Sequence, residues 1–188
     1  DQIYLTGFTG EDGAVVITPR QVYLVTDGRF RQTAAEQAPW ARAIIRKKSL
    51  RSALATLIRR LGAQRVGFQP ARMSVADYQS LRSAIRPSRL VRMQDVVGQL
   101  RMVKDEKEIE AIRRAVRLAE RAFQAVRRWI RPGRTEREIA ARLEYQMRCM
   151  GADGPAFATI VAEGPNAALP HAQPTDRVIR QGSAVLLD

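Results

Sequence analysis

Residues 151–188 read GADGPAFATIVAEGPNAALPHAQPTDRVIRQGSAVLLD, an irregular stretch in which Gly and Pro surround two short apolar runs. The runs at 157–162 and 184–187 are short enough to predict strands rather than helices. The loop between them holds His171, and the second run is followed by Asp188. Because binding groups concentrate on loops held by a rigid scaffold, we expect the functional site of the chain in this stretch.

His171 is the only histidine of the chain. It lies between Pro170 and Pro174, which stiffen the loop, and it follows Asn166, which can hold a turn. A lone histidine is more often structural or simply exposed. In a stiff loop, however, an imidazole can donate a hydrogen bond or shuttle a proton near a reacting carbonyl. His171 is therefore the candidate catalytic and substrate-binding residue.

Asp188 follows an apolar run, so its carboxylate is expected at the end of a short buried strand. A buried carboxylate without a partner is costly, and a metal cation is one way to compensate its charge. The other interpretation is a strand end that emerges into water, where an Asp needs no partner. From the residues alone, both interpretations of Asp188 remain open.

Before residue 151, two helices are predicted from the capping patterns at their N-termini. Asp105 followed by Glu108, and Thr135 followed by Glu138, are capping-box patterns, and Gly151 supplies a stop for the second helix. One apolar face of the first helix is formed by residues at alternating steps of three and four: Ile109, Ile112, Val116, Ala119, Phe123, Val126 and Ile130. The first helix is interpreted as scaffold packed on a sheet, without a catalytic role. The second is expected to bury a stripe formed by Ile139, Leu143, Met147 and Met150.

The first hundred residues alternate short strands and helices, which favours an α/β layer. Strands are predicted at 3–5, 14–18, 22–26, 43–46, 65–68 and 90–93. Helices are predicted at 30–37, from the cap Ser49 to 61, at 75–85 after the cap Ser74, and briefly after the cap Asp95. The character changes near residue 98, so we expect one domain at 1–98 and a second at 99–188.

Composition narrows the class of protein. The chain has 188 residues, of which 45% are apolar, and no apolar run long enough to span a membrane. No signal peptide is visible. The single cysteine, Cys149, is expected to be buried, and one cysteine forms no internal disulfide. Both observations predict a cytoplasmic protein.

The formal charge of +13 suggests nucleic-acid binding. The arginines, however, are dispersed from Arg20 to Arg180 without stacking aromatics, so we rank nucleic acid low as a partner.

Several of these stretches resemble the Xaa-Pro aminopeptidase and prolidase family of pita-bread metallopeptidases. The resemblance is most specific at 151–188, and 100–113 (LRMVKDEKEIEAIR) is similar to the family's entry into its catalytic domain. Residues 4–10 (YLTGFTG) and 25–30 (VTDGRF) resemble its creatinase-like N-terminal domain. The resemblance implies a creatinase-like N-terminal α/β domain followed by the first part of a pita-bread α+β catalytic domain, in a fragment truncated at both ends.

The resemblance also implies an activity. The family hydrolyses the bond before proline in peptides with proline at the second position, with two divalent metal ions, commonly manganese, although cobalt or zinc also suits such a site. By position, Asp188 matches the first metal ligand, and His171 matches a histidine that contacts the substrate rather than a metal. The other ligands would lie beyond Asp188, so residues 1–188 alone are expected to bind no metal pair and to be inactive. Homodimers are frequent in the family.

Two alternatives keep this fold: a creatinase-type hydrolase that uses no metal, and a non-catalytic pita-bread binding module. A basic nucleic-acid-binding protein is the alternative from another class. A second Asp shortly after Asp188 would separate the metal-dependent peptidase from the others. The sequence does not distinguish a dipeptidase from an aminopeptidase, nor does it identify the metal or the oligomeric state.

Overall fold

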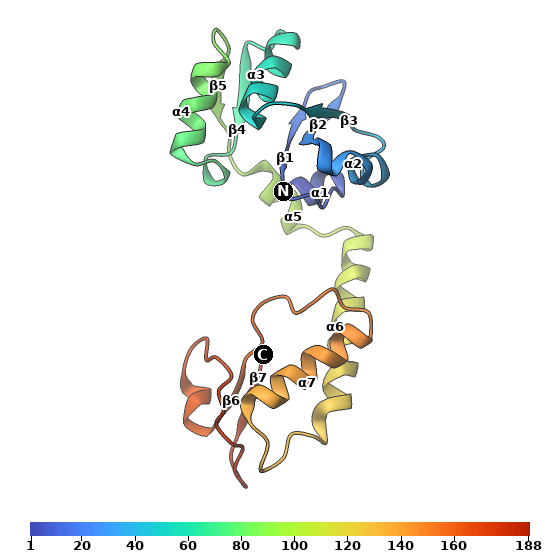
Figure 1. Ribbon diagram of the computed structural model, residues 1–188, viewed down its shortest axis with the longest axis vertical. Helices are drawn as coiled ribbons and strands as arrows, with labels where there is room; N and C mark the ends of the chain where they lie inside the picture. Colours follow the sequence, from blue (N-terminus) through green and yellow to red (C-terminus); the bar gives the residue numbers. More distant parts are fainter. The chain divides into compact units, whose positions relative to one another are not determined.

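The computed structural model describes residues 1–188 and divides them into two compact units, 1–103 and 104–188. The ribbon of Figure 1 follows the chain through both. Helix α5 (Val96–Met102) belongs to the first unit. The boundary suggested by the sequence, between residues 98 and 99, therefore falls inside this helix. None of the helices combines the length and the apolar character that a bilayer crossing requires.

The first unit begins with a three-stranded sheet in the order β1-β2-β3. Strands β1 (Gly13–Ile17) and β2 (Val22–Asp27) form an antiparallel hairpin. The 3-10 turn η1 (Gly28–Phe30) and helix α2 (Arg31–Gln37) then return the chain to β3 (Arg42–Arg46), which pairs parallel to β2. The buried residues of this half are Phe8, Leu24, Ala34, Ala38 and Ala41.

The predicted strand at 3–5 is wrong, because these residues lie in the short helix α1 (Gln2–Thr6). β-branched and aromatic residues favour strands mainly when a neighbouring strand is present to pack against, and none pairs here. The helix is held at its ends instead. The Thr6 hydroxyl donates to the Gln2 carbonyl at 2.8 Å, and Gly7 ends the helix in the left-handed conformation at φ 76°.

The second half of this unit is a βαβ arrangement. Helix α3 (Leu50–Arg60) leads into β4 (Arg65–Phe68), and the 3-10 turn η2 (Pro70–Arg72) and helix α4 (Val75–Ala84) connect it to β5 (Arg89–Arg92). β4 and β5 pair in parallel. The predicted caps Ser49, Ser74 and Asp95 are confirmed, since each side chain accepts a backbone N–H of the helix that follows. The buried residues here are Ala55, Ile58, Leu81 and Ile85.

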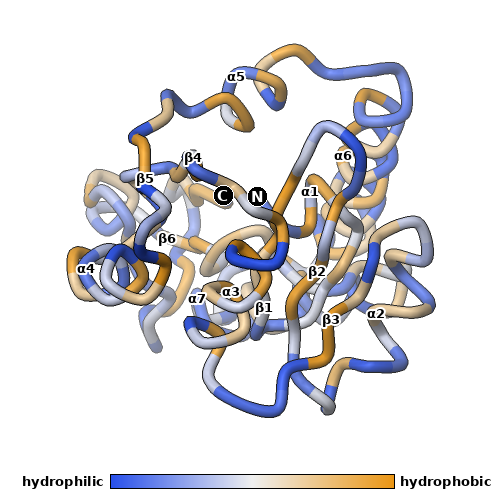
Figure 2. The backbone as a smooth tube through the Cα atoms, turned by 90° about the horizontal axis from the view of Figure 1, so that it is seen from above, coloured by the Kyte–Doolittle hydropathy of each residue, from blue (hydrophilic) through white to orange (hydrophobic).

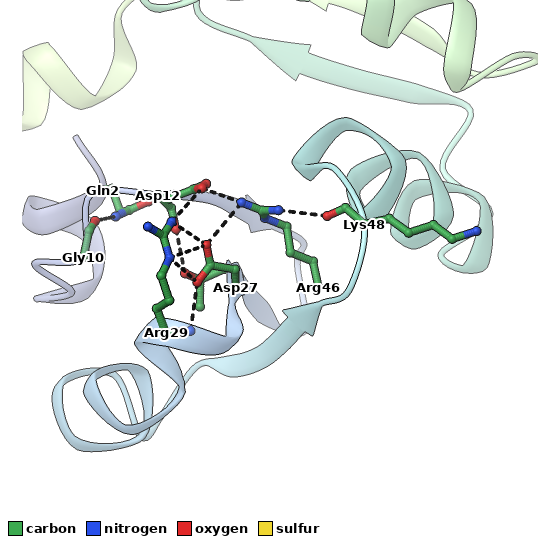
Figure 3. Close-up of polar contacts among 8 residues, drawn as sticks. Gln2, Gly10, Asp12, Asp27, Arg29, Arg46 and Lys48 are labelled. Carbon is green, nitrogen blue, oxygen red and sulfur yellow. Dashed lines mark hydrogen bonds and ion pairs between the residues drawn. The ribbon is translucent and has the colours of Figure 1, made fainter.

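An Asp–Arg cluster, formed by Asp12, Asp27, Arg29 and Arg46, lies where β2 and β3 end (Figure 3). Arg29 contacts Asp27 at 2.7 Å, and Arg46 forms ion pairs with both Asp12 and Asp27. The hydrogen bond from Arg29 holds the pKa of Asp27 below its usual value, although burial opposes this. Two acids and two bases balance each other, so the cluster fastens the ends of the strands together.

The second unit is built on two helices, α6 (Glu106–Arg127) and α7 (Glu136–Cys149), which pack against each other. Both predicted capping boxes are confirmed. The colour of the tube alternates between hydrophobic and hydrophilic along α6 (Figure 2). Ala122 and Val126 are fully buried, whereas Ile112 and Val116 are 52% and 51% exposed. With 14 residues against 22, α7 is too short to cover the first turns of α6.

Beyond α7, strands β6 (Val161–Glu163) and β7 (Val185–Leu187) pair antiparallel. The strand predicted at 157–162 is wrong in its first part, because backbone pairing begins with the two bonds between Ile160 and Asp188, and the strand itself begins at Val161. Cys149, expected to be buried, is exposed. The buried residues of this unit are Ala122, Val126, Ile139, Ala140, Leu143, Val161 and Ile179.

Candidate active-site loop

His171 lies in the connection between β6 and β7, just after the 3-10 turn η3 (Gly164–Ala168). Its backbone φ is 55°, and it is the single non-glycine residue of the chain with a positive φ. This left-handed conformation is uncommon for a residue with a side chain, and it persists where the surrounding structure holds it in place. The imidazole is exposed and is therefore free to meet a ligand from solvent.

The loop is fastened at both ends to one carboxylate, that of Glu136 in the first turn of α7. Glu136 is 0% exposed. Its Oε1 accepts the backbone N–H of Glu163 at 2.7 Å and the side-chain amide of Asn166 at 3.1 Å. Its Oε2 accepts the backbone N–H of Thr175 at 2.9 Å and the Thr175 hydroxyl at 2.6 Å. One buried carboxylate thus joins the segments before and after His171.

A second contact closes the same loop. The Nε–H of Arg177 donates to Oε2 of Glu163 at 2.5 Å, and the Glu163 side chain is 1% exposed. The helix start takes part as well, because the backbone N–H groups of Glu136 and Arg137 donate to the carbonyls of Arg177 and Thr175, both at 3.1 Å. Backbone donors of a first helical turn have no partner within the helix, so the loop satisfies them.

These contacts keep both buried carboxylates ionised. Burial opposes the charge of Glu136, but the hydrogen bonds from Thr175, from the Glu163 backbone and from Asn166 outweigh it and lower its pKa below the usual value. The pKa of Glu163 is also lowered, by a hydrogen bond from Ser183 and by Arg177. The carboxylates of Glu136 and Glu163 are buried against the loop, and their role is to hold it in place.

Asp188 follows β7, where its backbone N–H donates to the Ile160 carbonyl at 3.0 Å and its own carbonyl accepts the Ile160 N–H at 2.8 Å. Its side chain is exposed. No hydrogen bond or ion pair joins it to His171. No group of three or more His, Cys, Asp or Glu side chains is placed to hold a metal ion. The residues of this chain therefore do not by themselves fit a metal pair.

Sequence reasoning misses Glu136 and Arg177. Acids are common in the first turn of any helix because they complement its dipole. Glu138 is marked by the capping-box spacing, whereas Glu136 belongs to no pattern. The signal that does exist is indirect. Asn166 is recognisable as a turn residue close to His171, and the structure shows that its side chain donates to Glu136.

Comparison with known proteins matches each of the two units to a family model. The model of the creatinase/prolidase N-terminal domain matches residues 1–103, and that of metallopeptidase family M24 matches residues 110–188. The uncharacterized peptidase YqhT of Bacillus subtilis is 34% identical over 185 residues, which are 98% of this chain and 52% of that protein. The Xaa-Pro dipeptidase of Pyrococcus horikoshii is 42% identical over 97 residues, 52% of this chain and 28% of that protein.

Solved structures agree. The Xaa-Pro dipeptidase from Bacillus anthracis matches with a TM-score of 0.93 and 32% identity, over 100% of this chain and 52% of that one. The X-Pro aminopeptidase from Thermotoga maritima matches with a TM-score of 0.92 and 36% identity, over 100% and 53%. The chain thus spans about half the length of these relatives. The expected fold class is confirmed: the chain belongs to the creatinase/prolidase family, as a creatinase N-terminal α/β domain followed by the first part of a family M24 metallopeptidase region.

Proposed function

We propose that this chain is part of an Xaa-Pro dipeptidase or aminopeptidase that hydrolyses the peptide bond before proline, and that His171 contacts the substrate there. The observation that carries the proposal is the conformation of His171, an exposed imidazole held at φ 55° by a loop that a buried carboxylate fastens at both ends. Relatives named as Xaa-Pro dipeptidases and an X-Pro aminopeptidase support the reaction and the peptide substrate.

The role of His171 follows from its chemistry. An imidazole that the protein leaves without an internal partner can donate a hydrogen bond to charge that develops on a substrate carbonyl. Its loop backbone is fixed before the substrate arrives, so little ordering is needed in the transition state. His171 would thus orient the scissile region of a peptide with proline at its second position.

Asp188 is proposed as one ligand of a metal site, in keeping with a family of metallopeptidases. A pair of divalent ions, with manganese as the first candidate, would supply an activated water for hydrolysis. Such a pair needs more ligands than the single carboxylate of Asp188, and residues 1–188 bring no such set together. We therefore propose that residues 1–188 alone are inactive. A cytoplasmic location and a homodimer are further parts of the proposal.

The test compares His171→Ala with the unchanged protein at its full natural length. Release of proline from an Xaa-Pro dipeptide, and of the first residue from an Xaa-Pro tripeptide, separates the two peptidase types. We expect turnover to fall about 100-fold or more, the size of effect that removing one donor to developing charge has elsewhere. Bound metal, measured by elemental analysis, should stay unchanged.

Gln173→Ala is the matched control, because Gln173 is an exposed neighbour in the same loop. Loss of metal in His171→Ala would refute the role as a substrate contact, and unchanged turnover would refute a role in the reaction. Activity that survives complete chelation would favour the metal-free, creatinase-type hydrolase. Absence of any hydrolysis, with retained peptide binding, would favour a binding module.

A further inference from the structure

Glu136 divides its two carboxylate oxygens between the two flanks of His171. Oε1 accepts from the upstream flank, through Glu163 and Asn166, and Oε2 accepts from the downstream flank, through both donors of Thr175, with a longer contact of 3.4 Å from Asn166. The segment between these flanks contains His171 and the buried Ala172. Glu136 is thus a buried attachment point shared by both flanks, next to the Arg177–Glu163 contact and the backbone bonds to the start of α7.

The negative charge is essential to this arrangement. A carboxylate accepts at both oxygens and has no proton to donate, whereas an amide of the same shape has one oxygen and an –NH₂ group. In a Gln at position 136, that –NH₂ would face either the Glu163 N–H or the two donors of Thr175. Donors would then oppose donors around a side chain that is 0% exposed, where an unpaired polar group is costly. Only the ionised carboxylate satisfies both flanks.

His171 depends on this support because nothing else aims its ring. The imidazole makes no hydrogen bond within the chain, so the backbone of the loop is what sets the direction in which the side chain leaves it. The left-handed backbone of His171 is itself unfavourable for a residue with a side chain, and it is retained only while its surroundings enforce it.

We infer that Glu136 is the positioning residue of His171: its buried carboxylate holds the loop in the one path that keeps His171 left-handed and its imidazole presented to solvent. Glu136 acts through the loop and does not touch the substrate. The effect on turnover rests on the proposed function, whereas the effect on the placement of His171 does not.

The first experiment observes His171 directly, in the full chain. As the only histidine, it contributes one set of imidazole signals to a ¹³C- and ¹⁵N-resolved NMR spectrum. In Glu136→Gln, we expect these signals to shift toward those of histidine in an unstructured peptide and to broaden. The Cα and Cβ shifts of His171 should lose their left-handed character. Backbone signals of α6 establish that the unit is still folded.

Glu138→Gln is the matched control. Glu138 is a carboxylate in the same helical turn, and its partners are Thr135 and Arg134 rather than the loop. We expect this variant to leave the His171 signals in place even though it weakens the cap of α7. If Glu136→Gln does not fold, Thr175→Val carries the test, because it removes one donor to Oε2 and keeps the carboxylate. A partial shift in the same direction is expected.

A second experiment measures turnover at full natural length in a double-mutant cycle. Glu136→Gln should lower kcat by up to about 100-fold, as a small displacement of a positioned group can, and should have no further effect in the His171→Ala background. A folded Glu136→Gln protein with unchanged His171 signals would overturn the inference. If Glu136→Gln shifts the His171 signals but His171→Ala leaves turnover unchanged, the inference stands and the proposed function is refuted.

Discussion

At the scale of single residues, the buried carboxylates of Glu136 and Glu163 make the second unit sensitive to acid. Both have pKa values below those of an ordinary glutamate. In the unfolded chain, a glutamate takes up its proton near pH 4.3. Their contribution to stability is therefore complete above that pH and is lost as the pH falls through the lower pKa of the folded state.

We predict that Glu136→Gln removes part of this pH dependence. The unchanged chain should lose stability as the pH falls below about 4.3, whereas the variant starts lower and declines less, so that the two curves approach each other in acid. Glu163, paired with Arg177, remains in both proteins and contributes, with Asp27 and Glu138, to the decline they share. Thermal unfolding of both proteins as a function of pH measures the difference. Parallel curves would contradict the prediction.

What the sequence can reveal about the site also depends on residue type. His171 and Asp188 stand out because a lone histidine in a proline-stiffened loop and an acid after an apolar run are visible patterns. Glu136 does not stand out, because its importance comes from four donors that the fold brings to it from three residues far along the chain. Long-range convergence of this kind leaves no local spacing to detect.

At the scale of elements, helix starts are predicted well because their signals are local. The capping boxes at Asp105 and Thr135 fix both N-termini within one turn. The errors at 3–5 and 157–159 have the opposite origin. Apolar and β-branched residues occur there, but the neighbouring strand that would pair with them is missing, and propensity alone does not make a strand.

We predict that Thr135→Ala destabilises the second unit by about 1 kcal/mol, the usual effect of removing an N-cap hydroxyl. The hydroxyl accepts the Glu138 N–H at 3.1 Å. Trp129 reports the unfolding of this unit by fluorescence, once Trp40 of the first unit has been replaced by Phe.

Gln124→Ala is the control for this prediction, since Gln124 is an exposed residue in the interior of α6. Alanine is at least as good a helix former as glutamine, so this variant should not lose stability. The midpoint of urea unfolding should therefore fall for Thr135→Ala alone. Equal midpoints for the two variants would contradict the prediction.

At the scale of the whole molecule, the first unit contains two complete buried clusters, one around Phe8 and Leu24 and one around Ile58 and Ile85. Each is built from residues of the first unit alone. Helix α5 completes this unit, because Arg101 lies 3.6 Å from the carboxylate of Asp1. Buried clusters of this kind supply most of the free energy that folds a small domain.

We predict that residues 1–103, produced alone, fold cooperatively and unfold in urea as a single transition. Residues 1–98, which end inside α5 and lack Arg101, should be less stable. Limited proteolysis of the intact chain should spare the first unit longer than the second, whose helix α6 exposes part of its apolar face. Equal resistance of the two units would contradict this ranking, and a non-cooperative 1–103 would show that the first unit depends on the second.

The half-exposed residues Ile112 and Val116 on α6 also affect how the protein behaves in solution. Two such chains gain free energy when these apolar surfaces meet, while a net charge of +13 on each chain drives them apart. Salt screens the repulsion and leaves the apolar attraction intact. We therefore expect the chain to stay dispersed in dilute buffer and to self-associate increasingly as the ionic strength rises.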